Sequence, residues 1–219
     1  KMECELEFLK PWKSQANTQF VLSPADGGTK VTWQMQSSLP WFMFFLKSMM
    51  KRLISMDHTR GLKMLKQMLE EGKVDSKLEY NPSEQIIGCH YISIQTTCSI
   101  DDMDTHMSRD YKRLKELSLK NKLDGDHAVP FTTYQKWKLG KGIVTYTCAI
   151  PIKEKLKSIA ELPFETVSGY RPPCNAYTVT HTGDYRHLGN AWTSAMMRSR
   201  NKLFKQSKKI MPFELFITD

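Results

Sequence analysis

Apolar and polar residues in the first third of the chain follow the pattern of strands and then of a helix. Side chains alternate in the strand-like stretches, as Val31 and Trp33 show, and the turn at residues 24–28 favours a hairpin. Three strands are expected, and they cover residues 4–9, 18–22 and 29–36. Residues 41–69 then carry apolar side chains at helical spacing, and Gly72 is a suitable stop.

The rest of the chain shows a similar set of elements twice, after a polar connector at residues 73–81. The first unit is expected to contain strands 86–95, 131–137 and 143–150 with a helix at 101–120. The second is expected to contain strands 164–170, 175–182 and 212–218 with a helix at 184–205. Two such units predict a pseudo-symmetric α+β domain, with helices on one face of an antiparallel sheet and a cleft between the units. We therefore divide the chain into a domain at 1–72, a linker at 73–81 and a domain at 82–219.

The two helices expected after residue 100 have recognisable first turns. Ser99 and Asp102 have the spacing of a capping box, and Asp184 after Gly183 is a natural N-cap. One face of the first of these helices is apolar, which indicates core packing. Its members are Met103, Met107, Tyr111, Leu114 and Leu117.

The last predicted strand carries a single charge, Glu214. Because side chains alternate along a strand, Glu214 and Phe216 share one face, and Phe213, Leu215 and Ile217 form an apolar core face on the other. A carboxylate among apolar neighbours either pairs with a cation or takes up a proton, which is typical of a pocket for cationic, aromatic ligands. The alternative is that Glu214 lies on a solvated sheet face or pairs with a lysine.

Net charge does not indicate a nucleic-acid interface. The chain has 219 residues and a net charge of +9, but the basic residues are spread over many segments and do not form one stripe. No helix-turn-helix, zinc knuckle or glycine-rich phosphate loop accompanies them. We therefore expect no direct contact with nucleic acid.

Cysteine usage and hydropathy are typical of a cytoplasmic protein. The five cysteines are odd in number and lack CxxC spacing, which favours reduced thiols. The longest apolar run, residues 39–46, is too short to span a bilayer, and no signal peptide is present. The chain opens at Lys1 without an initiator methionine, inside a strand-like pattern, as expected of a fragment.

Residues from about 80 to 219 resemble the GyrI-like family, the effector-binding fold that is also attached to AraC-type and MerR-type multidrug regulators. The matching residues are 177–183 (YTVTHTG), Tyr185, the helix with Trp192, and 212–216 (PFELF). The resemblance implies a cleft between two related modules that takes bulky, often cationic hydrophobic molecules. It also implies that the acidic, ligand-contacting residue of the last strand is Glu214.

Residues 1–72 resemble the last third to half of a START-like, polyketide-cyclase-like domain. The matching residues are 27–33 (GGTKVTW), Leu39 and Pro40, and a helix with Asp57, Gly61, Leu62, Leu65 and Lys66. The resemblance implies a curved sheet that packs on a long terminal helix. With part of that fold missing, the aromatic residues near position 41 are expected to favour association.

The expected ligand site has Glu214 as the counter-ion of a cationic small molecule. Its candidate aromatic walls are Tyr185, Trp192, Tyr146 and Phe216, because cations are attracted to aromatic faces. For Trp192 the alternative is core packing, since it lies in an apolar helical stripe.

Two other function classes stay open. Some GyrI-like proteins hydrolyse reactive cyclopropane-bearing toxins, so the resemblance allows Glu214 as general base and Tyr185 as acid. A protein-interaction module with a protein partner is the third class. No cofactor and no metal are expected, because neither the acids near His106 nor His181 and His187 show metal-ligand spacing.

Overall fold

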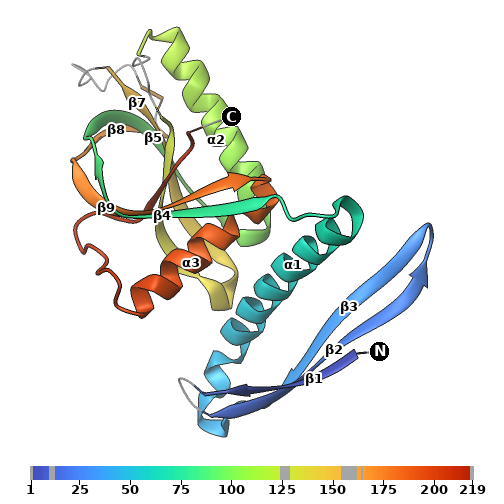
Figure 1. The fold of residues 1–219 in the computed structure, drawn as a ribbon. Helices are drawn as coiled ribbons and strands as arrows, with labels where there is room; N and C mark the ends of the chain where they lie inside the picture. Colours follow the sequence, from blue (N-terminus) through green and yellow to red (C-terminus); the bar gives the residue numbers. More distant parts are fainter. Residues whose placement is uncertain (1, 10–12, 124–128, 154–161, 164, 218–219) are drawn as a thin grey trace. The chain divides into compact units, whose positions relative to one another are not determined.

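A computed structural model describes residues 2–9, 13–123, 129–153, 162–163 and 165–217 of the protein. They form three α-helices and ten strands in a mixed α+β fold, which confirms the predicted class (Figure 1). Phe164 and Thr218, the expected ends of two strands, lie outside the described residues. None of the described helices is long and apolar enough to cross a membrane.

The chain forms two compact units. The first consists of Lys1–Ser76 and Thr182–Gly189, and the second of Lys77–His181 and Asn190–Asp219.

The first unit contains an antiparallel sheet and a long helix. The sheet has the order β1 (Met2–Phe8), β2 (Ser14–Ala25), β3 (Gly28–Ser37), and η1 (Trp41–Leu46) leads into α1 (Lys47–Glu71). Trp33 of β3 stacks on His58 of α1 with ring centroids 4.1 Å apart. Gly61 of α1 lies so close to this ring that a Cβ atom there would come within 2.7 Å of it. Gly72 ends α1 with φ +74°, as its position predicted.

Residues 182–189 pack against the C-terminal part of α1 within the same unit. His187, in η4 (Tyr185–His187), is fully buried, and its Nε2 lies 2.7 Å from Oε1 of the buried Gln67. The same Gln67 oxygen accepts a hydrogen bond from the Asp75 backbone N–H at 3.0 Å. Asp184 caps η4, since its side chain accepts from the Arg186 N–H at 2.9 Å. This segment is therefore fixed by buried polar contacts as well as by its cap.

Gly183 is the residue of this segment that tolerates substitution least. Its φ is +125°, and a Cβ atom would lie 2.4 Å from the Asp75 carbonyl oxygen. We expect Gly183→Ala to lower the free energy of unfolding by about 2 kcal/mol, because both the backbone and the contact are strained. Urea denaturation measures this loss. Gly140→Ala, where an added Cβ meets nothing within 4 Å, is the control, and an equal loss in both variants would contradict the prediction.

The second unit is built on a five-stranded antiparallel sheet. Its order is β10 (Phe213–Leu215), β6 (Phe131–Lys138), β7 (Ile143–Ile152), β5 (Cys89–Ser99), β8 (Thr166–Arg171). The helix α2 (Met103–Lys120), preceded by η2 (Ile100–Asp102), packs on β5 and β7. The core between them contains Ile92, Leu114, Val144, Tyr146 and Cys148, and the predicted apolar face of α2 joins it. η3 (Leu139–Lys141) forms the turn between β6 and β7.

A two-stranded sheet of β4 (Ser76–Ile86) and β9 (Cys174–Gly183) positions the last helix, α3 (Gly189–Arg200). The Arg198 guanidinium lies 3.7 Å from the centroid of the Tyr80 ring and donates to the Tyr177 hydroxyl at 3.1 Å. Ser194 is hydrogen-bonded to the Tyr80 hydroxyl at 3.0 Å. Contacts along α3 therefore join it to both strands.

Three elements differ from the sequence expectation. β4 covers most of the segment expected to be a connector, and most of its side chains are exposed, so it lacks an apolar pattern. α3 ends at Arg200, five residues before its predicted end at 205. The chain leaves the helix through Lys202, whose φ is 60°. β10 is three residues long because only Phe213 to Leu215 pair with β6.

Candidate functional site

The pairing of β10 with β6 determines what surrounds Glu214. Glu214 pairs with Thr132, and Phe213 pairs with Thr133. Tyr134, two residues beyond Thr132 on the same strand, therefore lies on the same sheet face as Glu214. α3 brings Trp192 to this carboxylate as well.

Two aromatic side chains donate hydrogen bonds to the two oxygens of Glu214. The Tyr134 hydroxyl donates to Oε2 at 3.0 Å, and the Trp192 indole N–H donates to Oε1. The Tyr134 and Trp192 rings meet edge to face, with centroids 5.3 Å apart and an interplanar angle of 89°. The centroid of the Trp137 ring lies 5.5 Å from that of Tyr134, and Trp137 is 40% exposed. Glu214, Tyr134 and Trp192 are each half-buried, so the site is only partly shielded from solvent.

The electrostatics of Glu214 are dominated by burial. Burial raises the pKa of the Glu214 carboxyl, and the hydrogen bonds from Trp192 and Tyr134 oppose this shift. Burial, together with the neighbouring Glu214 charge, also raises the pKa of Tyr134, which keeps its hydroxyl a donor. The ion pairs found among the described residues do not include Glu214. The carboxylate is therefore neither on a fully solvated face nor neutralised by a lysine of the described chain.

The raised pKa has a consequence for stability. Because the folded protein holds the Glu214 proton more tightly than the unfolded chain, it binds more protons between the usual glutamate pKa and the raised one. The free energy of unfolding therefore falls as the pH rises through this window, by at most about 1.4 kcal/mol per pH unit. We expect the wild type to lose stability relative to Glu214→Gln across this window, as measured by urea denaturation at several pH values. A stability difference that does not change with pH would show that burial does not shift this carboxyl.

Phe216, a predicted wall residue, lies on the Glu214 side of the sheet. Its ring contacts Tyr111 of α2 edge to face at 5.5 Å, and the Tyr111 hydroxyl bonds to Thr132, the residue paired with Glu214, at 2.8 Å. Thr132 also lies 3.8 Å from the Cys148 sulfur. Burial raises the pKa of Cys148 to about 12, so this thiol is not an activated nucleophile.

Tyr146, another predicted wall residue, lies in the core of the second unit. Tyr146 is fully buried, and its hydroxyl donates to Oδ2 of Asp110 at 3.1 Å. It is therefore a core residue with no surface for a ligand, which corrects the expectation that it forms a wall. Tyr185 is 61% exposed and belongs to the first unit, in η4.

The opposite face of β10 is not the plain core that the alternation predicted. Phe213 and Phe131 stack on the Arg171 guanidinium, whose carbon lies 4.7 and 4.5 Å from their ring centroids. Ile217 is 70% exposed, which corrects its placement in the core. Arg171 of β8 thus contacts β10, the other edge strand of the sheet, on the face opposite to Glu214.

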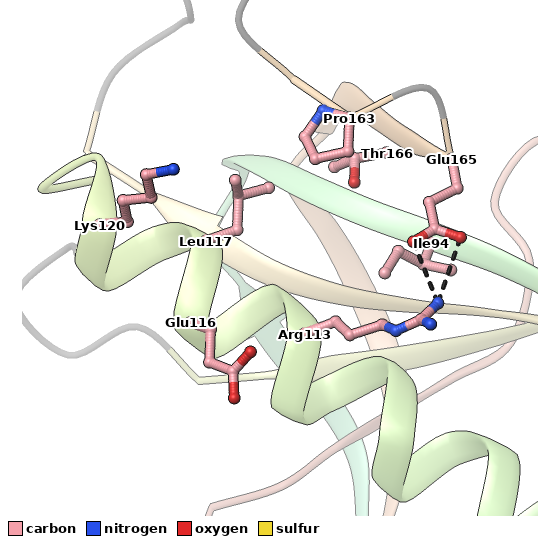
Figure 2. Close-up of a pocket in the computed structure, with 8 residues that line it drawn as sticks. All are labelled: Ile94, Arg113, Glu116, Leu117, Lys120, Pro163, Glu165 and Thr166. Atoms are coloured by element: carbon pink, nitrogen blue, oxygen red, sulfur yellow. Dashed lines mark hydrogen bonds and ion pairs between the residues drawn. The ribbon is translucent and has the colours of Figure 1, made fainter.

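A surface hollow of about 310 Å³ lies between α2 and β8, away from Glu214 (Figure 2). Arg113 crosses it and donates to both oxygens of Glu165, at 3.0 and 3.2 Å. Both side chains are about half exposed, at 47% and 54%. This exposed ion pair already joins two of the charged side chains that line the hollow, so the hollow is not our candidate site. The described residues also contain no cluster of three His, Cys, Asp or Glu side chains that could hold a metal ion.

Tyr134 and Trp137 were not among the site residues predicted from the sequence. Both lie in a segment that was correctly expected to be a strand, β6. The aromatic residues of β6 are visible in the sequence, but no local pattern indicates that β6 pairs with β10. The signal that identifies them is the register of that pairing.

Comparisons with known proteins give similarity of fold alone. No protein-family model matches the chain, and no curated protein matches its sequence, so the GyrI-like and START-like resemblances stay predictions. Among solved structures, a chain in the cryo-EM structure of the EcmrR–DNA complex in EcmrR-RPo is similar, with a TM-score of 0.51 and 18% identity. The match covers 79% of this chain but only 59% of that one. An integron cassette protein from the mobile metagenome of Vibrio cholerae matches with a TM-score of 0.37 and 13% identity, over 66% of this chain and 89% of that chain. The chain therefore shares its fold with part of the EcmrR chain.

Proposed function

We propose that the second unit binds a bulky, cationic and aromatic small molecule at Glu214. The observation that carries the proposal is a half-buried carboxylate that has two aromatic hydrogen-bond donors and no cation among the described ion pairs. A ligand cation would supply the missing positive charge. Burial raises the pKa of Glu214, and among the described residues only the hydrogen bonds from Trp192 and Tyr134 oppose it, with no contribution from a cation.

The aromatic neighbours define the shape of the proposed ligand. Tyr134 and Trp192 bring two aromatic rings to the carboxylate and Trp137 packs on Tyr134, and each cation–ring contact would contribute about 0.5–2 kcal/mol. A flat or propeller-shaped organic cation satisfies both requirements, whereas a small inorganic cation would leave the rings without contacts. Phe216 would support the site through Tyr111.

Residues 82–219 are the proposed ligand-binding domain, except that 182–189 belong to the first compact unit, and residues 1–72 are the proposed START-like part. The neighbour EcmrR is seen in a complex with DNA. For this chain we assign the ligand recognition and not the DNA contacts, because its basic residues do not form a single stripe.

The alternative is hydrolysis at the same site, with Glu214 as general base. A raised carboxyl pKa favours this role, since a base works best when its pKa is near the working pH. The hydroxyl that bonds Glu214 is that of Tyr134, whereas Tyr185, the acid expected from the sequence, lies in the first unit.

A thermal-shift screen of organic cations, with chromatography of each hit before and after incubation, tests the proposal. We expect stabilisation by cationic aromatic compounds in the wild type and in Glu116→Gln, a change of an exposed acid, but not in Glu214→Gln. An unchanged compound means binding, and a consumed compound means the hydrolase. If no cation stabilises the wild type, or if Glu214→Gln responds as the wild type does, the proposed site is wrong.

A further inference from the structure

Four large aromatic side chains of η1 in the first unit are exposed to solvent. Their exposed fractions are 86% for Trp41, 59% for Phe42, 74% for Phe44 and 68% for Phe45. The rings contact one another in two edge-to-face pairs, Trp41 with Phe42 and Phe44 with Phe45, at 6.2 and 6.1 Å. We call these four residues the aromatic turn. Clustered exposed apolar side chains of this size mark an interaction surface.

Along the sequence, the charged residues next to the aromatic turn are all positive. Lys47 and Lys51, in the first turns of α1, are exposed, and neither takes part in the ion pairs found among the described residues. The first turn of α1 has no acidic residue, so its positive helix dipole is not neutralised there. Residues 27–56 contain no Asp or Glu at all. These charges favour an acceptor that is negative as well as apolar.

We propose that the aromatic turn and Lys47 and Lys51 dock on an anionic lipid surface. Phe and Trp side chains enter the boundary between headgroups and acyl chains, and lysines bind the anionic headgroups above it. This binding is peripheral and needs no membrane-spanning helix, in agreement with the described helices.

A second copy of the chain fits this surface less well. A symmetric dimer brings the same patch of both copies together, so each Lys47 and Lys51 would face the same charges of its partner. Like charges at an interface oppose association. Anionic lipid has the opposite charge and requires no pre-formed pocket.

Vesicle flotation of the full chain tests this proposal. We expect the wild type to float with phosphatidylcholine vesicles that contain about 30% phosphatidylserine and not with pure phosphatidylcholine. Phe44→Ser/Phe45→Ser is expected to weaken binding by about tenfold or more, because it removes inserted apolar area. Lys47→Glu/Lys51→Glu should also weaken it by about tenfold or more, since each basic residue contributes about fivefold.

Lys112→Glu/Lys115→Glu is the matched control, since it makes the same change in net charge at exposed positions of α2. The control is expected to bind nearly as the wild type does. Circular dichroism confirms that each variant is folded, which is expected because all changed residues are exposed. Failure of the wild type to bind phosphatidylserine vesicles overturns the proposal, and so does equal loss in the control. A dimer in gel filtration that Phe44→Ser/Phe45→Ser abolishes, without vesicle binding, would assign the surface to a second copy instead.

Discussion

Glu214→Gln is expected to weaken the binding of a cationic aromatic dye such as crystal violet by roughly 30-fold to 100-fold. Glutamine keeps the size of the side chain but lacks the charge that would pair with the ligand. Loss of one partner of a partly desolvated charge pair costs about 2–2.7 kcal/mol, which corresponds to this factor. Fluorescence titration of the dye with the wild type and with Glu214→Gln measures the two affinities.

Two controls accompany this prediction. Tyr134→Phe removes one hydrogen bond to Glu214 but keeps the ring and the carboxylate, so we expect a change of only about fivefold. Glu116→Gln changes an exposed acid on α2 and should leave the affinity unaltered. The account is contradicted if Tyr134→Phe loses as much affinity as Glu214→Gln, since hydrogen bonding would then matter more than charge.

Asp110→Ala is expected to lower the free energy of unfolding of the second unit by about 3 kcal/mol. The Asp110 carboxylate is fully buried and accepts from Thr96 at 2.6 Å, from Tyr146 at 3.1 Å and from Arg109 at 2.8 Å. Alanine would leave the buried Tyr146 hydroxyl without an acceptor and remove the Arg109 pair, whose side chain is 43% exposed and counts for less. Urea denaturation measures the change.

A double-mutant cycle separates these contributions. Tyr146→Phe removes only the hydroxyl. We therefore expect it to lower the free energy of unfolding by about 1 kcal/mol in the wild type, and by less, or to raise it, in the Asp110→Ala background. Additive losses would mean that Asp110 and Tyr146 do not depend on each other. A loss below about 1 kcal/mol for Asp110→Ala would mean that the buried network contributes little to stability.

Local sequence patterns were sufficient to predict the position and buried face of the elements that have a clear apolar face. The face of α2 with Tyr111 and Leu114 packs on the core as its spacing predicted. Alternation also placed Glu214 and Phe216 on the same side of β10, and Tyr111 links them through Thr132. In both cases the rest of the unit covers one side of the element. The side chains on that side are therefore apolar or aromatic at the spacing of the element, and this spacing can be recognised in the sequence.

Long-range pairing explains what the sequence did not show. Tyr134 and Glu214 are 80 positions apart in the chain, and only the register of β10 on β6 brings them together. β4 is mostly exposed and is recognisable as a strand only through its partner β9. The end of α3 near Arg200 follows from a positive φ at Lys202, a residue type that gives no stop signal of its own.

The most direct test of the central claim is isothermal titration of crystal violet and of its uncharged leuco form into the wild type and Glu214→Gln. If Glu214 recognises positive charge, Glu214→Gln loses roughly 30-fold or more of its affinity for the cation and less than about threefold for the neutral form. If Glu214→Gln weakens the binding of both compounds equally, or of neither, the site does not recognise cations through Glu214.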